Sequence, residues 1–399
     1  MKVRYDTRFY ITRILQGVKE VWKSYEQRQR DSLTDRQRER ERETDKQRAN
    51  SALNIEELES GLTYLKSYPR RLVLEMTSAC NIKCVFCGRD EAEFNQTYLK
   101  LDVLDKLSNV LEYCEEVTLF GWGEPTINPQ FSQFLERLNT TSVRKYFVTN
   151  GTRLDKFIDD IFTHRVDIIA ISLDGPSSLV NDKIRVGAKF EKVTENIRAI
   201  VRKKEELGVG YPYLNFVFVA MESNIRELPK MVRLAKDLHM QEVKVVFLTA
   251  FSTQMLPQSL YNKQDVIRAV FDEALALAEK LEIHLKLPYI QGEDIARDKY
   301  HKDCFVGWRD FFIGSDDSIR PCQSTSLKLG ALSDYATFEE AWNSPLMQDF
   351  RKRVNDEKTM PLQCKLCYQS SHANWNQKTS FIQVGTAFAP DWTKNAREK

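Results

Sequence analysis

The sequence predicts an α/β fold in which a parallel sheet is built from repeated strand–helix units. Between Pro69 and about Pro288, short apolar segments alternate with amphipathic segments of helical length. Strands are expected near residues 72–76, 117–120, 145–149, 167–173, 213–220 and 243–249. Strands that alternate with helices favour βαβ units, whose crossovers make the strands parallel. With 399 residues, 42% of them hydrophobic, the chain can bury a sizeable core and has room for more than one domain.

The first 67 residues are expected to form a charged helical extension outside the sheet. Large apolar residues are almost absent from Glu26 to Arg48, where Arg, Gln and Glu dominate. Such a run favours a solvated helix or a flexible tether. Apolar residues between Phe9 and Trp22 recur at helical spacing, which suggests docking on the protein itself or on a partner.

Composition and charge restrict the functional classes. The formal net charge is +2, so nothing in the charge balance requires a nucleic-acid partner. Charged residues interrupt the apolar residues of the first 17 positions, which therefore lack the apolar core of a signal peptide or spanning helix. No membrane association is expected, and the chain is expected to be cytoplasmic. Eight cysteines in such a chain favour metal ligation over disulfides, whereas Cys114, ending an expected helix, is expected to be buried in the core.

Three cysteines crowd the loop that follows the first expected strand. Cys80, Cys84 and Cys87 stand in the sequence Cys-Asn-Ile-Lys-Cys-Val-Phe-Cys. Three thiolates are one short of the four that close a structural zinc site or an ordinary iron–sulfur cluster. An iron left open in this way can bind a substrate or cofactor. Taken alone, the triplet also fits a zinc knuckle or a set of buried thiols.

The spacing of this triplet resembles the cluster loop of the radical S-adenosylmethionine (SAM) enzymes. In that family three cysteines hold a [4Fe–4S] cluster, and its open iron chelates the amino and carboxylate groups of SAM. Reduction of the cluster cleaves SAM to methionine and a 5'-deoxyadenosyl radical. The resemblance implies a partial (β/α)6 barrel of the TIM type, an electron donor of the flavodoxin or ferredoxin type, and a position for Phe86 near the adenine.

A second motif follows the next expected strand. The run Gly121-Trp122-Gly123-Glu124-Pro125 resembles the Gly-Gly-Glu-Pro motif of the same family, with Trp122 in place of the usual glycine. A backbone without side chains at Gly121 and Gly123 can approach the amino group of SAM closely. The carboxylate of Glu124, which precedes Pro125, favours an ammonium group.

Polar residues also follow the third and fourth expected strands, which resemble the corresponding strands of the family barrel. These are Asn150, Ser172 and Asp174. Ser172 and Asp174 lie two residues apart, hence on one face of a strand, where they could hold the ribose and carboxylate of SAM. The Asn-Gly and Asp-Gly pairs are also ordinary turn formers. Arg185 resembles a family position where an arginine often helps to bind SAM, although a surface charge is the alternative.

Four further cysteines lie near the C-terminus: Cys304, Cys322, Cys364 and Cys367. The segment 311–322 is expected to form a β-hairpin whose polar turn delivers Cys322. The pattern resembles the auxiliary-cluster domain called SPASM, or Twitch in its shortened form. Because no cysteine follows Cys367, the resemblance implies one auxiliary [4Fe–4S] cluster held by all four thiolates. A structural zinc ion is the alternative.

These motifs divide the chain into an extension (1–67), a radical SAM barrel (68–290) and an auxiliary-cluster domain (291–399). A fully ligated cluster has no open iron, so its expected work is to draw an electron from a substrate radical, which favours net oxidation. The N-terminus does not resemble the stranded leader-binding domain of many peptide maturases. We therefore expect oxidation of a small-molecule alcohol or similar C–H site. A maturase of ribosomal peptides or sulfatases, or a non-catalytic iron–sulfur or zinc electron-transfer protein, is the alternative.

Overall fold

The structure is a computed structural model of the 399-residue chain. It describes residues 44–89, 95–250, 253–260, 263–288, 290, 304–322, 327–356 and 358–365. The chain divides into two compact units, Met1–Asp45 and Lys46–Lys399. The expected docking helix between Phe9 and Trp22 lies outside the described residues, as does Cys367.

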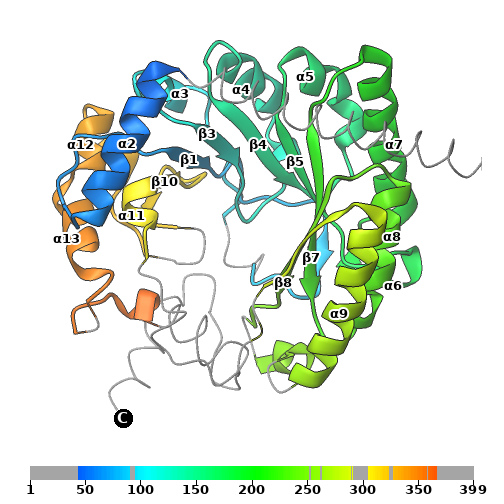
Figure 1. The fold of residues 1–399 in the computed structure, drawn as a ribbon. Coiled ribbons are helices and arrows are strands. Elements are labelled where there is room, and N and C mark those ends of the chain that lie inside the picture. The colour runs from blue at the N-terminus through cyan, green and yellow to red at the C-terminus, as the bar shows by residue number, and fades with distance from the viewer. Residues whose placement is uncertain are drawn as a thin grey trace, which may run out of the picture. The chain divides into compact units, whose positions relative to one another are not determined.

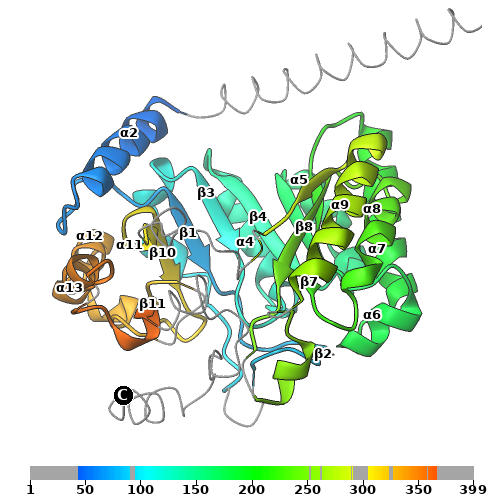
Figure 2. The same ribbon diagram turned by 60° about the horizontal axis from the view of Figure 1, so that its bottom comes forward.

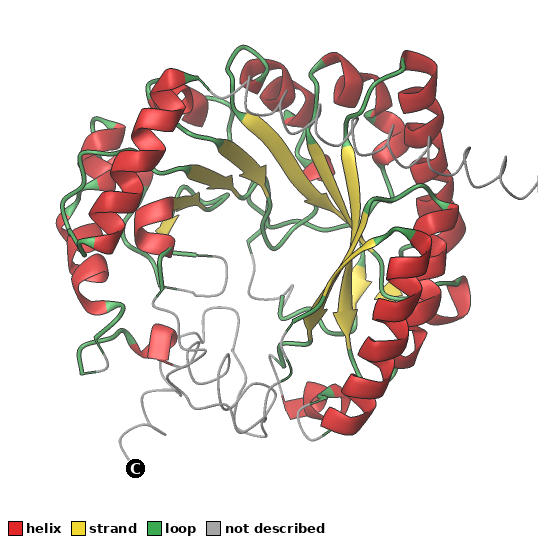
Figure 3. Ribbon diagram, viewed as in Figure 1, coloured by secondary structure: helices red, strands yellow, loops and turns green. Residues whose placement is uncertain are grey.

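One curved sheet organises the second unit (Figures 1 and 3). Within the described residues it has nine strands in the order β11-β10-β1-β3-β4-β5-β7-β8-β9. The strands are β1 (Arg71–Leu74), β3 (Glu116–Leu119), β4 (Arg144–Thr149), β5 (Ile168–Ser172), β7 (Tyr213–Ala220), β8 (Glu242–Phe247), β9 (His284–Lys286), β10 (Asp310–Ile313) and β11 (Ile319–Arg320). All neighbours pair in parallel except β10 and β11, which are antiparallel. The carboxyl ends of the parallel strands therefore share one edge.

Helices cover the outer face of this sheet (Figures 1 and 3). The main connecting helices are α3 (Val103–Lys106), α4 (Phe131–Leu138), α5 (Ile158–Thr163), α6 (Ser178–Ile184), α7 (Phe190–Leu207), α8 (Leu228–Asp237) and α9 (Gln264–Leu281). In α4 the buried residues are Phe131, Phe134, Leu135 and Leu138, a single apolar stripe at helical spacing. Phe131 meets Phe147 of β4 edge to face, with ring centroids 5.3 Å apart. This stripe explains why the segment packs as a helix on the sheet.

The six expected strands correspond to β1, β3, β4, β5, β7 and β8, which confirms the predicted α/β fold of strand–helix units. Two more parallel strands extend the sheet. β9 has three residues, and both His284 and Lys286 are exposed, so it carries no apolar run. β10 was expected only as part of a hairpin. It does pair with β11, but it also lies parallel to β1, with Leu72 opposite Phe311.

The C-terminal segment is thus continuous with the barrel sheet. Arg71 of β1 forms a 2.6 Å ion pair with Asp310 of β10. Phe311 packs edge to face on Phe338 and Trp342, which belong to the helix α12 (Phe338–Trp342). The helices α11 (Val306–Arg309) and α13 (Pro345–Arg353) complete this part. The expected boundary at residue 290 falls between two strands of one sheet.

The helix α2 (Asp45–Glu59) packs through polar side chains. Its buried residues are Gln47, Asn50, Ser51, Asn54 and Glu57, which recur at helical spacing. Gln47 Nε2 donates to the Cys114 carbonyl at 2.6 Å, and Asn54 Nδ2 donates to the Trp308 carbonyl at 2.9 Å. The stripe therefore satisfies backbone groups of the barrel and of α11. Cys114 itself is fully buried, as expected.

None of the described helices combines the length and apolarity needed for crossing a bilayer.

Candidate active site

The first three cysteines lie in the loop that leaves β1. Cys84 belongs to β2 (Lys83–Cys84), which pairs antiparallel with β6 (Arg185–Val186) in a separate two-stranded sheet. Figure 2 shows β2 and α6 at the same edge of the barrel. The Cys87 N–H donates to the Cys84 carbonyl at 3.0 Å and closes a turn between the two thiols. Cys80, Cys84 and Cys87 are all half-buried.

The glycine-containing motif packs directly on this cysteine loop. The Gly123 N–H donates to the Thr77 carbonyl at 3.1 Å, and the Glu124 N–H donates to the Ala79 carbonyl at 2.8 Å. A Cβ atom at Gly123 would lie only 2.2 Å from the Ala79 carbonyl oxygen, which no side chain tolerates. Glycine is therefore required for contact with the loop that carries Cys80. Its contact with SAM stays a prediction.

Glu124 connects the motif to the end of β4. Its buried carboxylate accepts hydrogen bonds from Thr126 N–H and Oγ1, Thr149 Oγ1 and, at 2.7 Å, Asn150 N–H. Burial raises the pKa of the Glu124 carboxyl, while these hydrogen bonds oppose the shift. With Glu124 as N-cap, Pro125 occupies the first turn of a short 3-10 helix. The contact of Glu124 with the SAM ammonium group stays a prediction.

Asn150 reaches the cysteine loop from the end of β4. Its Nδ2 donates to Asn81 Oδ1 at 2.9 Å and lies 3.9 Å from Cys80 Sγ. Its Oδ1 accepts from Thr152, and Gly151 has a φ of +77°. Asn150 therefore forms a turn and also places an amide donor beside a candidate ligand sulfur.

A buried ion pair joins the end of β5 to the cysteine loop. Asp174 is fully buried, and its Oδ2 lies 2.7 Å from Arg185 Nε. Arg185 Nη1 donates to Cys84 Sγ at 3.6 Å, and its guanidinium lies 5.3 Å from the centre of the Phe86 ring. Arg185 is 6% exposed, so the surface-charge alternative is wrong. Ser172 is half-buried at the end of β5.

Burial works against negative charge on the acidic members of this group, and Arg185 is the cation that partly offsets it. Burial raises the pKa of Asp174, against the lowering effect of Arg185. Burial lowers the pKa of Arg185, but Asp174 and Cys84 outweigh it and raise the value. Burial also raises the pKa of Cys80, and that of Cys84 to about 11, with Arg185 opposing the shift at Cys84. Thiols at a strand end beside a fixed cation can become the thiolates that metal binding requires.

Three thiols from one loop, with polar donors beside two of them, form a donor set that fits an iron–sulfur cluster. Within the described residues, no three Cys, His, Asp or Glu side chains converge closely enough for one metal ion. A four-iron cluster takes each thiolate at a different corner, so its ligands stand further apart. Arg185 and Asn150 direct donors at Cys84 and Cys80, and hydrogen bonds to ligand sulfurs are a normal feature of such clusters.

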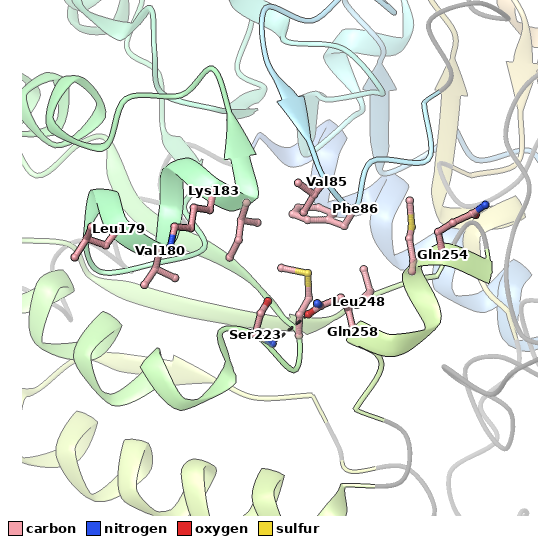
Figure 4. A pocket seen from close by; sticks show the side chains of 12 residues that line it. Val85, Phe86, Leu179, Val180, Lys183, Ser223, Leu248, Gln254 and Gln258 are labelled. Carbon is pink, nitrogen blue, oxygen red and sulfur yellow. Dashed lines mark hydrogen bonds between the residues drawn. The ribbon is translucent and has the colours of Figure 1, made fainter.

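A pocket of about 630 Å³ opens beside Phe86 (Figure 4). It is lined by Val85, Phe86, Leu179, Val180, Lys183, Ile184, Met221, Ser223, Leu248, Gln254, Met255 and Gln258. Phe86 packs with Ile184, Met221 and Leu248 in one small apolar cluster. Met221 and Leu248 follow β7 and β8 directly, and sequence reasoning missed them both. Met221 directly follows the fifth expected strand and Leu248 lies at the end of the sixth, and these positions were the available signal.

The second cysteine set comes from three separate segments. Cys304 precedes α11, Cys322 follows β11, and Cys364 lies in a helical turn near the end of the described residues. Asn355 fixes the Cys304 backbone by accepting from its N–H at 2.8 Å and donating to its carbonyl at 3.1 Å. With Cys367 outside the described residues, the joint ligation by all four cysteines stays a prediction.

Two family models match the sequence in these two regions. The radical SAM superfamily matches residues 74–235, which run from β1 into α8. An iron–sulfur cluster-binding domain, SPASM, matches residues 304–368, a range that begins at Cys304 and includes the three other C-terminal cysteines.

Several curated proteins are similar to the chain. A tungsten-containing aldehyde ferredoxin oxidoreductase cofactor-modifying protein of Pyrococcus furiosus is 24% identical over 258 residues, 63% of this chain and 70% of that protein. The mycofactocin maturase MftC of Mycobacterium tuberculosis is 29% identical over 188 residues, 45% of this chain and only 44% of the maturase. The PqqA peptide cyclase of Gluconobacter oxydans is 25% identical over 328 residues, 76% of this chain and 84% of the cyclase.

Solved structures share the fold. Streptococcus suis SuiB bound to S-adenosylmethionine has a TM-score of 0.59 at 16% identity, over 76% of this chain and 72% of SuiB. The structure of anSMEcpe with bound AdoMet has a TM-score of 0.56 at 18% identity, over 83% of this chain and 91% of that chain. The rim of the barrel carries the cysteine loop and the glycine-containing motif. Together with the two family models, this identifies the chain as a radical SAM enzyme with a C-terminal SPASM-type iron–sulfur cluster-binding domain.

Proposed function

We propose that the chain is a radical SAM maturase that modifies a peptide or protein substrate. The observation that carries this proposal is the similarity to the PqqA peptide cyclase, which extends over 76% of this chain and 84% of the cyclase. The mycofactocin maturase supports it over a shorter range. These relatives favour the peptide alternative over the small-molecule alcohol that the charged N-terminus suggested.

In the proposed reaction, Cys80, Cys84 and Cys87 hold a [4Fe–4S] cluster with one open iron. When bound and reduced, this cluster supplies the electron that cleaves SAM to methionine and a 5'-deoxyadenosyl radical. Arg185 compensates the negative charge on the Cys84 sulfur and closes off that side of the loop. Because Val219 N–H and Arg185 occupy both oxygens of Asp174, we assign Asp174 the role of orienting Arg185.

The pocket beside Phe86 is the proposed place for the adenosine part of SAM. The apolar side chains of Phe86, Met221 and Leu248 can enclose a flat ring and exclude water from it. Gln254 and Gln258 lie on the border of the same pocket and offer amide groups to a heterocycle (Figure 4). Ser172 remains a candidate for the ribose of SAM, whereas an ammonium contact at Glu124 would have to be shared with the hydrogen bonds that its carboxylate accepts from Thr126, Thr149 and Asn150.

The four C-terminal cysteines are the proposed ligands of an auxiliary [4Fe–4S] cluster that accepts one electron from the substrate. Such a cluster would supply an electron acceptor, so that a substrate giving up a hydrogen atom to the deoxyadenosyl radical, a proton to a base and one electron to the cluster would undergo a net two-electron oxidation. A flavodoxin or ferredoxin is the proposed donor to the first cluster.

The test is anaerobic reconstitution with iron and sulfide, followed by dithionite, SAM and a candidate peptide. We expect 5'-deoxyadenosine to form, with peptides of the PqqA and mycofactocin precursor type stimulating it and losing roughly two mass units, as removal of two hydrogens requires. Zinc instead of iron at the C-terminal cysteines would remove the electron acceptor. An intact cluster that never cleaves SAM would contradict the enzyme assignment.

A small molecule is the second candidate substrate. The relative in Pyrococcus furiosus is named for modifying a cofactor, and its match covers 70% of that protein. The same assay with small alcohols and nucleotides separates the two candidates. Deoxyadenosine formation that responds to a small molecule and not to any peptide would overturn the peptide proposal.

A further inference from the structure

Glu75 is a buried carboxylate that lies outside the cysteine loop and the glycine-containing motif. It directly follows β1 and is 1% exposed. Its Oε1 accepts from Trp122 N–H at 2.9 Å, while its Oε2 accepts from Ser315 N–H at 3.1 Å and Ser315 Oγ at 3.2 Å. One side chain therefore ties the first strand to the SAM motif and to the turn between β10 and β11.

The Glu75 side chain explains why the first residue of the motif, Gly121, is a glycine. A Cβ atom at Gly121 would lie 2.2 Å from Glu75 Cγ and 2.7 Å from Glu75 Oε1. Any larger residue would have to displace the buried carboxylate. Gly121 and Glu75 are thus sterically matched across two neighbouring strand ends.

The contacts of Glu75 extend toward both sets of cysteines. Arg320 Nη2 lies 3.6 Å from Glu75 Oε2, and Arg320 stands two residues before Cys322. In the other direction, Ser315 Oγ lies 2.7 Å from Thr97 Oγ1, and Thr97 N–H donates to Ser78 Oγ at 2.9 Å. Ser78 stands two residues before Cys80. A continuous polar network therefore connects the two cysteine regions.

A carboxylate is a costly way to fill this position. Burying a charge is strongly unfavourable unless hydrogen bonds and an opposite charge compensate it, and an apolar side chain could fill the same space. The carboxylate makes the packing specific, because its two oxygens need hydrogen-bond donors and these come from the segments of Trp122 and Ser315.

We propose that Glu75 is a positioning residue, which holds the hairpin carrying Cys322 in register with the loop carrying Cys80. This inference rests on the proposed function, because in that function the two cysteine regions take part in one reaction. Glu75 touches neither ligand sulfur directly, and it acts through Trp122, Ser315 and Arg320.

The experiment compares Glu75→Gln with Glu116→Gln. Glu116 is the matched control because it is also a buried strand carboxylate paired with an arginine, Arg144 at 2.8 Å, but it lies at the opposite strand ends. We expect both variants to lose thermal stability. Only Glu75→Gln should accelerate amide exchange in segments 119–124 and 311–322, on the order of tenfold, as loss of a charge-assisted hydrogen bond predicts.

The reconstituted proteins supply a second measurement. The midpoint potential and electron paramagnetic resonance signal of the C-terminal cluster should change in Glu75→Gln and stay unchanged in Glu116→Gln. Ser315→Ala removes a partner of the same network from the hairpin side and should repeat the exchange effect in 311–322. Unchanged exchange and an unchanged cluster signal in both Glu75→Gln and Ser315→Ala would overturn the inference.

Failure of the proposed function would look different. Wild-type protein that carries both clusters but forms no deoxyadenosine would refute the maturase proposal, whereas the exchange comparison would still decide the role of Glu75.

Discussion

The two cysteine regions of this enzyme are built in opposite ways. The first gathers three thiols within one loop of eight residues, and charged and amide side chains from neighbouring strand ends reach its sulfurs. The second draws its cysteines from three segments spread over more than sixty residues. There, the Asn355 side chain hydrogen-bonds to the backbone of Cys304. Local spacing therefore defines the first region, whereas the second depends on how β10 joins the barrel.

This difference predicts that the first region can be disabled without dismantling the second. Replacing Cys84 with alanine should abolish deoxyadenosine formation and leave roughly four irons per chain, the content of the auxiliary cluster alone. The control is Cys114→Ala, which alters a buried thiol bonded to the Pro69 carbonyl. Iron counting and product analysis decide the outcome. Loss of all iron in Cys84→Ala would mean that the two regions assemble as one unit.

The buried ion pair is the next most sensitive point. In Arg185→Ala, Asp174 keeps a buried carboxylate without its cation, which should cost about 3–5 kcal/mol of unfolding free energy. Arg137→Ala breaks an exposed pair with Asp105 and should cost about 0–1 kcal/mol. Denaturant unfolding of the unloaded protein measures both. Equal losses of unfolding free energy in the two variants would show that Arg185 does not stabilise the buried charge of Asp174.

The contact between Gly123 and the cysteine loop should be too close for an added methyl group. Gly123→Ala places a Cβ atom against the Ala79 carbonyl, so the loop must move, at a cost of about 1–3 kcal/mol. We expect reduced iron in the first cluster and an altered cluster spectrum. Gly61→Ala meets no atom within 4 Å but carries the strain of a left-handed backbone (φ +63°), so it serves as the comparison for the cluster spectrum and iron content and not for stability. A normal spectrum in Gly123→Ala would separate loop packing from cluster assembly.

The smallest expected effect is in the pocket beside Phe86. Met221→Ala removes apolar contact from the proposed adenosine site and should raise the Kd for SAM about tenfold, without changing the iron content. Leu179, which is 75% exposed at the border of the pocket, is the control, and its alanine variant should bind SAM normally. Equilibrium binding to the reconstituted protein measures both. An unchanged Kd in Met221→Ala would place the adenosine elsewhere.

Much of the fold and part of the site could be predicted because they depend on short-range patterns. The runs of apolar residues mark β3 and β4, and the spacing of the cysteines from Cys80 to Cys87 predicts a metal-binding loop, because both signals are contained in a few consecutive residues. Glu75 could not be assigned in this way, and Arg185 was a candidate only through the family resemblance, with a surface charge as the alternative. An isolated charged residue in the sequence carries no sign that tertiary packing will bury it.

The helix α2 shows the same limit for packing. It belongs to the segment that was expected to form a charged helical extension outside the sheet, yet Asn50 and Asn54 face the protein interior and hydrogen-bond to backbone groups of Tyr68 and Trp308. A polar composition normally indicates solvent exposure. Here the polar side chains of α2 are buried because they pair with backbone groups of the surface that α2 covers.

By itself, the sequence determined the strand–helix order and the cysteine loop, because periodicity and residue spacing are local properties of the chain, and its motifs carried the resemblance that implied the family of chemistry. The tertiary structure alone decided that β10 extends the sheet beside β1, that Arg185 reaches Cys84, and that Glu75 meets Ser315 across 240 residues. Those contacts join residues whose separation along the chain leaves no pattern, and they form because buried charges and strand edges must find partners.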